Sequence, residues 1–140
     1  MSDKYFVDTN ILAYAHDTDS GSRHAKALAL VEKLWLSGEG VVSTQVLQEL
    51  SVFIRRKASR PMSDDEAYKV IEEFRIWEVV ENNLDSILGA IKLEARYQIS
   101  FWDALMLQAA MKAGATIVYS EDLADGQKYG AVRAVNPLKN

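Results

Sequence analysis

The sequence predicts an α/β fold in which a central parallel β-sheet of about five strands is flanked by helices on both faces. Short apolar runs alternate with longer segments in which apolar residues recur at helical spacing. Parallel strands need crossover connections, so strands that alternate with helices form a sheet with both faces covered. The length of 140 residues and the hydrophobic content of 49% fit one core. We therefore expect residues 1–140 to form a single domain.

The expected strands are five short apolar runs at residues 5–7, 41–42, 77–80, 116–119 and 131–135. Helices are expected from residue 11 onward and over residues 22–36, 44–57, 63–74, 84–91 and 102–113. Gly38 and Gly114 are natural helix stops, and Ser63 with Glu66 has the form of a capping box. Two helices between successive strands predict a doubly wound sheet, in which sites form beyond the carboxyl ends of the strands.

The composition excludes several kinds of chemistry. The sequence contains no cysteine, which excludes disulfides, cysteine zinc sites and thiol nucleophiles and favours a reducing, cytoplasmic compartment. The first residues lack the basic start and apolar stretch of a signal peptide, and no apolar run approaches the roughly 18 residues of a membrane span. The formal net charge of −4 is unusual for a nucleic-acid binder. Binding of a nucleic acid would therefore need metal ions and a local basic patch.

Two aspartates stand where predicted strands end. Asp8 directly follows the first strand, and Asp122 follows the fourth strand after two intervening residues. Asp8 or Asn10 could instead only cap the next helix, and Asp122 could be a turn residue. Two acids at the ends of two strands are harder to explain in this way than one, so we treat both as candidate site residues.

Two further acids lie on predicted helices. Asp103 comes three residues after Ser100, so it could simply occupy the first turn of a helix, where the positive helix end favours an ionised carboxylate. Glu49 lies within the helix expected over 44–57, with Gln45 one turn earlier on the same face, and alone it would be an exposed helix residue. Together with Asp8 and Asp122, these acids could converge on one hard cation such as Mg²⁺ or Mn²⁺.

Other polar and aromatic residues have two interpretations each. The basic residues that end the same helix either contact RNA phosphate or simply stabilise the helix end: Arg55, Arg56, Lys57 and Arg60. The tryptophans could stack on bases, but their apolar surroundings favour packing: Trp35, Trp77 and Trp102. The two histidines pair with no Ser or Asp at a telling spacing and are expected at the surface: His16 and His24.

Four motifs together resemble the PIN domain, and most closely its VapC-type toxin branch. The motifs are Val7-Asp8-Thr9-Asn10, Gln48-Glu49-Leu50, Phe101-Trp102-Asp103-Ala104-Leu105 and Tyr119-Ser120-Glu121-Asp122-Leu123. Each motif alone is weak. Their order makes the combination fairly specific, and so do the spacings of 41, 54 and 19 residues between the four acids (49−8, 103−49, 122−103). The resemblance covers nearly the whole chain.

The resemblance implies cleavage of RNA that depends on Mg²⁺ or Mn²⁺, inhibition by a cognate antitoxin, and a homodimer. Asp8, Glu49 and Asp103 match the three principal acids and Asp122 the fourth, and supporting polar residues match at Thr9, Asn10 and Ser120. Glu121 departs from the pattern because it could turn inward instead of Asp122. Alternation along an extended strand exit places Ser120 and Asp122 on the same side, which favours Asp122.

Three alternatives remain open at this point. A haloacid-dehalogenase-like phosphatase would use Asp8 as nucleophile, although it expects a second Asp where this chain has Asn10. A non-catalytic PIN-like module would bind RNA or protein without cleavage. A housekeeping RNA-processing nuclease would share the chemistry but not the toxin role.

Overall fold

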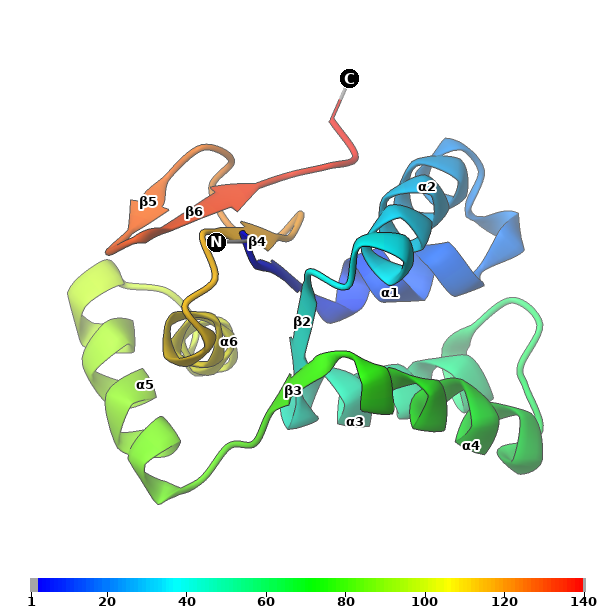
Figure 1. Ribbon diagram of the computed structural model, residues 1–140, viewed down its shortest axis with the longest axis horizontal. Coiled ribbons are helices and arrows are strands. Elements are labelled where there is room, and N and C mark those ends of the chain that lie inside the picture. Colours follow the sequence, from blue (N-terminus) through cyan, green and yellow to red (C-terminus); the bar gives the residue numbers. More distant parts are fainter. Residues whose placement is uncertain (1–2, 140) are drawn as a thin grey trace.

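The computed structural model describes residues 3–139, which form a six-stranded sheet flanked by helices (Figure 1). The strand order is β3-β2-β1-β4-β6-β5. The strands are β1 (Tyr5–Val7), β2 (Gly40–Ser43), β3 (Glu78–Val80), β4 (Ile117–Tyr119), β5 (Lys128–Tyr129) and β6 (Val132–Val135). The chain moves from β1 to β2 and β3 on one side and returns to β4 on the other side. The strand order therefore reverses between β1 and β4, which is where doubly wound sheets place their sites.

All five predicted strands are present and pair in parallel, and the structure adds a sixth. The added strand β5 has only two residues and pairs antiparallel with β6, with Lys128 opposite Arg133. Gly130 makes the turn between them with a φ of 60°, a backbone conformation that glycine adopts without strain. A two-residue strand is too short to give an alternating pattern, so the sequence did not reveal it.

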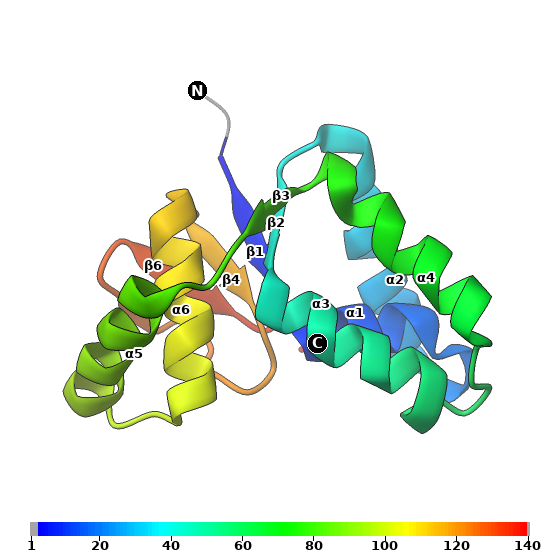
Figure 2. The same cartoon turned by 90° about the horizontal axis from the view of Figure 1, so that it is seen from below.

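Among residues 3–139, six α-helices form two layers, one on each face of the sheet, as predicted. Figure 2 shows α5 and α6 on one side of the strands and α1 to α4 on the other. The helices are α1 (Thr9–His16), α2 (Ser22–Ser37), α3 (Thr44–Val52), α4 (Asp64–Glu73), α5 (Leu84–Tyr97) and α6 (Phe101–Ala113). Helix α6 contacts β2, β3, β4 and β6, and α3 contacts β2, α1 and α4. Helices α3 and α6 therefore both reach the region where the strand order reverses.

The helix ends mostly follow the signals in the sequence. Gly38 and Gly114 are left-handed and end α2 and α6, and Ser63 forms a capping box with Glu66 at the start of α4. The chain is helical over the predicted range 44–57, but the last five residues are π-helical rather than α-helical. After Val52 the chain forms a π turn over Phe53–Lys57, in which Ala58 N donates to Phe53 O at 2.9 Å.

The core lies between the sheet and both helix layers. The central strands contribute fully buried side chains such as Phe6, Val42 and Val118. Gly40 begins β2 because the Trp77 ring lies against it, and a Cβ there would come within 2.5 Å of that ring. His16 and His24 are both partly exposed, and His24 Nδ1 lies 2.9 Å from the Tyr14 carbonyl oxygen.

Within residues 3–139, no helix is both long enough and apolar enough to cross a membrane.

Candidate active site

Asp8 lies at the carboxyl end of β1 and also caps α1. Its Oδ1 accepts from Thr9 N at 2.6 Å, and its Oδ2 accepts from Ser120 Oγ at 2.7 Å and from Asn10 Nδ2 at 3.3 Å. The side chain is buried, with a relative exposure of 8%. Helix α1 begins at Thr9, earlier than predicted, because Asp8 is its N-cap. Asp8 therefore caps α1 and also lines the cavity at the end of the strand.

The exit of β4 brings Ser120 and Asp122 to Asp8 and turns Glu121 away. Ser120 Oγ donates to Asp8 and accepts from Asp122 N at 3.0 Å, so one buried hydroxyl connects the two strand ends. Glu121 instead accepts a hydrogen bond from the Tyr14 hydroxyl at 2.6 Å. Asp122 lines the same cavity as Asp8. Asp122 lines the cavity and Glu121 does not, although the chain bends over residues 121–123 instead of continuing as an extended exit.

Asp103 and Glu49 approach the same region from two helices. Asp103 lies in the first turn of α6, where its backbone N donates to the N-cap Ser100 Oγ at 3.0 Å. Glu49 is an exposed residue of α3, and its Oε1 accepts from Thr9 Oγ1 at 2.7 Å. The Thr9 hydroxyl thus links the α3 acid to the residue that follows Asp8.

A cavity of about 770 Å³ is lined by all four predicted acids. Thr9, Asn10 and Lys57 also line it. Its volume lies within the range of about 300–1,000 Å³ that is common for small-molecule sites. The structure thus gathers around one cavity four acids that lie up to 114 residues apart in the chain (122−8).

Burial and mutual repulsion make this cavity electrostatically unfavourable without a cation. Burial raises the pKa of Asp8 to about 7, against the opposing hydrogen bonds from Ser120 and Thr9, and the charges of Asp122 and Asp103 raise it further. Burial also raises the pKa of Asp103, with a smaller contribution from Asp122. Both shifts reflect a cost of holding negative charge there, which a bound cation would offset.

The donor atoms fit a hard divalent cation. They are carboxylate oxygens, and Asn10 Oδ1 adds a buried acceptor without a hydrogen-bond partner. Within residues 3–139, no three acidic or histidine side chains already form a cluster that could hold a metal ion. The acids share a cavity and repel one another, but a complete coordination shell is not formed.

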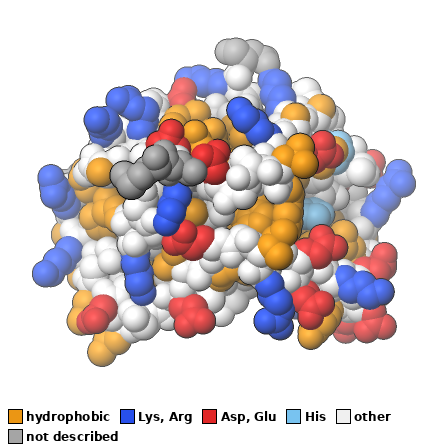
Figure 3. Space-filling view, viewed as in Figure 1, with side chains coloured by type: hydrophobic (Ala, Val, Ile, Leu, Met, Phe, Trp, Pro, Cys, Tyr) orange, Lys and Arg blue, Asp and Glu red, His pale blue; other side chains and the backbone are white. Residues whose placement is uncertain are grey.

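The four basic residues of the predicted RNA contact have different surroundings. Lys57 lines the acid-lined cavity, and Arg56 is exposed. Arg55 turns to the other side of α3, where it donates to Ser51 O at 3.0 Å and lies 3.7 Å from Asp64 Oδ1. Arg60 lies 3.7 Å from an Asp19 carboxylate oxygen. Figure 3 shows acidic and basic side chains interspersed over one face rather than gathered by sign.

The sequence predicts that all three tryptophans pack against apolar residues. Within this chain, Trp35 and Trp77 do so in the core and Trp102 does not. Trp35, Phe74 and Trp77 form a cluster with ring centroids 5.1 to 5.2 Å apart. Trp102 is 62% exposed and lines the acid-lined cavity. The sequence could have indicated that Trp102 lies at the site, because it directly precedes Asp103 and both residues lie in the first turn of one helix.

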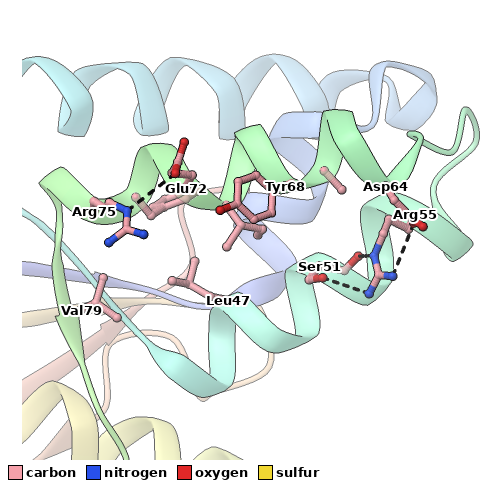
Figure 4. Close-up of a pocket in the computed structure, with 11 residues that line it drawn as sticks. Leu47, Ser51, Arg55, Asp64, Tyr68, Glu72, Arg75 and Val79 are labelled. Carbon is pink, nitrogen blue, oxygen red and sulfur yellow. Dashed lines mark hydrogen bonds and ion pairs between the residues drawn. The ribbon is translucent and has the colours of Figure 1, made fainter.

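A second cavity of about 510 Å³ lies between α3 and α4 (Figure 4). Leu47, Tyr68 and Val79 give it an apolar lining, and its charged groups occur in pairs. Arg55 pairs with Asp64, and Arg75 Nε lies 3.9 Å from Glu72 Oε2. We call this cavity the α3/α4 groove.

The sheet topology and the position of the acids define a doubly wound α/β protein with an acid-lined site. The family model described as "PIN domain" matches residues 5–124, and the chain belongs to this family. This membership leaves the haloacid-dehalogenase alternative without support. No curated protein sequence gives a significant match.

Solved structures share the fold at low sequence identity. The Mycobacterium tuberculosis toxin VapC20, described as cleaving the sarcin-ricin loop, aligns with a TM-score of 0.65 and 22% identity over 93% of this chain and 99% of that chain. A Klebsiella pneumoniae toxin–antitoxin complex aligns at 0.65 and 18%, over 96% and 98%. The DNA-bound VapBC of Salmonella typhimurium aligns at 0.64 and 16%, over 95% and 97%.

Proposed function

We propose that this protein is an endoribonuclease that hydrolyses RNA phosphodiester bonds with Mg²⁺ or Mn²⁺. The observation that carries the proposal is the gathering of Asp8, Glu49, Asp103 and Asp122 around one cavity at the point where the strand order reverses. Family membership and the raised pKa of Asp8 support it, because repelling carboxylates are the environment that a divalent cation stabilises. In this proposal residues 1–140 form one domain with the acid-lined cavity as its active site.

In this proposal Asp8, Asp103 and Asp122 would hold the metal. A divalent cation there would supply shielding of the phosphate charge and would make water a better nucleophile. Glu49 binds or orients the attacking water, and its hydrogen bond from Thr9 fixes its carboxylate. Ser120 and Asn10 hold the Asp8 carboxylate in its orientation. Water oxygen bonds to phosphorus, one P–O ester bond breaks, and the leaving oxygen takes a proton.

The test is cleavage of a 5′-labelled single-stranded RNA by purified protein with Mn²⁺, followed on a denaturing gel. We expect cleavage that stops with chelator and falls at least about 100-fold in Asp103→Asn, since that change removes a ligand charge. Asp64→Asn is the matched control, because Asp64 lies in the α3/α4 groove. Cleavage that persists in chelator, or in Asp103→Asn, would contradict the proposal, and so would a wild type that binds RNA without cutting it.

We further propose that the protein is the toxin of a toxin–antitoxin pair and acts in the cytoplasm. The likeness to solved VapBC and other toxin–antitoxin complexes supports an antitoxin partner, and the lack of cysteine fits a reducing compartment. The alternative is a housekeeping RNA-processing nuclease. Induced expression should arrest growth, and co-expression of an adjacent small reading frame should restore it. Normal growth with active nuclease would favour the housekeeping role.

We also propose a homodimer, with α5 as the contact surface. One face of α5 exposes four apolar side chains at helical spacing: Leu84 (69%), Ile87 (42%), Leu88 (49%) and Ile91 (51%). Exposed Asp85 and Lys92 lie near opposite ends of this stripe, so two antiparallel copies of α5 would bring unlike charges together. Light scattering should give a dimer mass for wild type and a monomer mass for Leu88→Asp. A monomeric wild type would contradict the proposal.

A further inference from the structure

Trp102 is the exception among the three tryptophans of the chain. Trp35 and Trp77 pack with Phe74 in the core, whereas Trp102 is 62% exposed at the acid-lined cavity. A large exposed aromatic side chain beside candidate metal ligands is in a position to contact a ligand in the cavity, and tryptophan is highly buried on average.

The position of Trp102 is fixed by contacts on two sides. Its ring makes an edge-to-face contact with Phe101, with centroids 5.3 Å apart and an interplanar angle of 81°. Its carbonyl oxygen accepts a hydrogen bond of 3.3 Å from Nε2 of Gln45, a residue of α3 that is only 8% exposed. The first turn of α6 is therefore tied to α3, and little conformational freedom remains to be lost when a ligand stacks on the ring.

The chemistry around Trp102 selects a neutral, planar ligand group. The acids of the cavity repel phosphate, and Lys57 is the cation that lines the cavity among the described residues. A nucleobase is uncharged and has a π-face, so it can stack on an indole ring without opposing those charges. Stacking would also give affinity for RNA to a protein whose formal net charge is −4.

We infer that Trp102 is a stacking platform for an unpaired nucleobase next to the phosphate that is cleaved. This inference rests on the proposed ribonuclease function and narrows its substrate to RNA in which that base is free of a helix. A base inside a duplex has both faces covered by its neighbours and cannot reach the ring. Since every base has a π-face, Trp102 favours unpaired bases without selecting strongly among the four.

The kinetic test compares Trp102→Ala and Trp102→Phe with wild type on single-stranded RNA in Mn²⁺. We expect Trp102→Ala to raise KM at least about fivefold with kcat within about threefold, and Trp102→Phe to lie between it and wild type. Tyr68→Ala is the matched control, because Tyr68 is 66% exposed but lies in the α3/α4 groove. We expect it to leave KM unchanged.

The binding test uses tryptophan fluorescence, because only Trp102 among the three is largely exposed at the cavity. A uridine decamer in Ca²⁺ should quench the emission of wild type, whereas Trp102→Phe should show no quenching. A duplex of equal length should quench wild type much less. Quenching with no cleavage in Mn²⁺ would retain the stacking site and reject the nuclease proposal.

Two results would overturn the inference while leaving the nuclease proposal in place. The first is active wild type with KM unchanged in Trp102→Ala. The second is a rise in KM that accompanies loss of the dimer in light scattering of Trp102→Ala, which would assign Trp102 to an interface between copies.

Discussion

Helix α3 and the π turn that follows it, Phe53–Lys57, lie between two different cavities. On one side Gln48, Glu49 and Lys57 line the acid-lined cavity, and on the other Leu47 and Arg55 line the α3/α4 groove. In the groove, opposite charges are paired and the lining is apolar. In the acid-lined cavity, like charges face one another and burial raises the pKa of the central aspartate to about 7. Unfavourable electrostatics, rather than apolar enclosure, therefore mark the side where chemistry is expected.

Helical geometry explains how neighbouring residues come to lie on opposite sides. Leu47, Ser51 and Arg55 are spaced by four and share one stripe of the helix, so Arg55 can bond to Ser51. Glu49 lies half a turn away and meets Thr9 instead. The π turn after Val52 changes the direction of the residues that follow, and Lys57 reaches the acid-lined cavity.

The largest expected effect concerns the stability of metal-free protein through Asp8. Its pKa is about 7 in the folded state, against an ordinary value of 3.8 for a solvated aspartate, so the folded state binds the extra proton between these pH values. Stability of the metal-free protein should therefore fall as pH rises from about 4 to about 7 and stay low above that. The ceiling of this loss is about 4 kcal/mol, from roughly three pKa units at 1.36 kcal/mol each.

Asp8→Asn should remove most of this pH dependence and raise the stability of metal-free protein at pH 8, because asparagine also caps a helix well. Urea unfolding from pH 4 to pH 8 measures the effect. Mn²⁺ should stabilise wild type at pH 8 but not Asp8→Asn. If the free energy of unfolding of Asp8→Asn depended on pH as steeply as that of wild type, Asp8 would not be the source of the unfavourable electrostatics that distinguishes the acid-lined cavity from the groove.

An intermediate effect, on the affinity for RNA, is expected when Lys57 is replaced by glutamine, with Arg55 as the comparison. Lys57→Gln should weaken binding of single-stranded RNA about three- to tenfold and reduce the log–log salt slope by about 0.7, since one phosphate contact is lost. Arg55→Gln should change neither, because Arg55 is engaged with Ser51 and Asp64. Filter binding at several salt concentrations tests this. Equal losses for both variants would show that RNA extends to the groove side.

The smallest effect is expected in the groove. Asp64 is 90% exposed in its pairing with Arg55, so Asp64→Asn should change the free energy of unfolding by less than about 0.5 kcal/mol. RNA cleavage should remain at the wild-type rate. A clear loss of activity in Asp64→Asn, measured beside Asp103→Asn, would mean that the two cavities are coupled through α3.

Much of the fold could be predicted because its signals are local. Gly38, Gly114 and the Ser63–Glu66 capping box marked helix ends that the structure contains. The π turn at Phe53–Lys57 could not be predicted, because its wide hydrogen bonds leave no distinct period in five residues. The two-residue strand β5 depends on its pairing with β6, and its own sequence gives no strand pattern.

For the site, the sequence alone determined which acids stand at strand and helix ends, because strand exits and first helical turns follow from local patterns. Only the tertiary structure decided what those residues meet. In the folded protein, Ser120 donates a hydrogen bond to Asp8, and Tyr14 donates one to Glu121. Arg55 and Lys57 line different cavities, and Trp102 is exposed at the acid-lined cavity. The physical reason is that burial, charge repulsion and hydrogen-bond partners depend on residues from distant parts of the chain. Local periodicity contains no information about those distant neighbours.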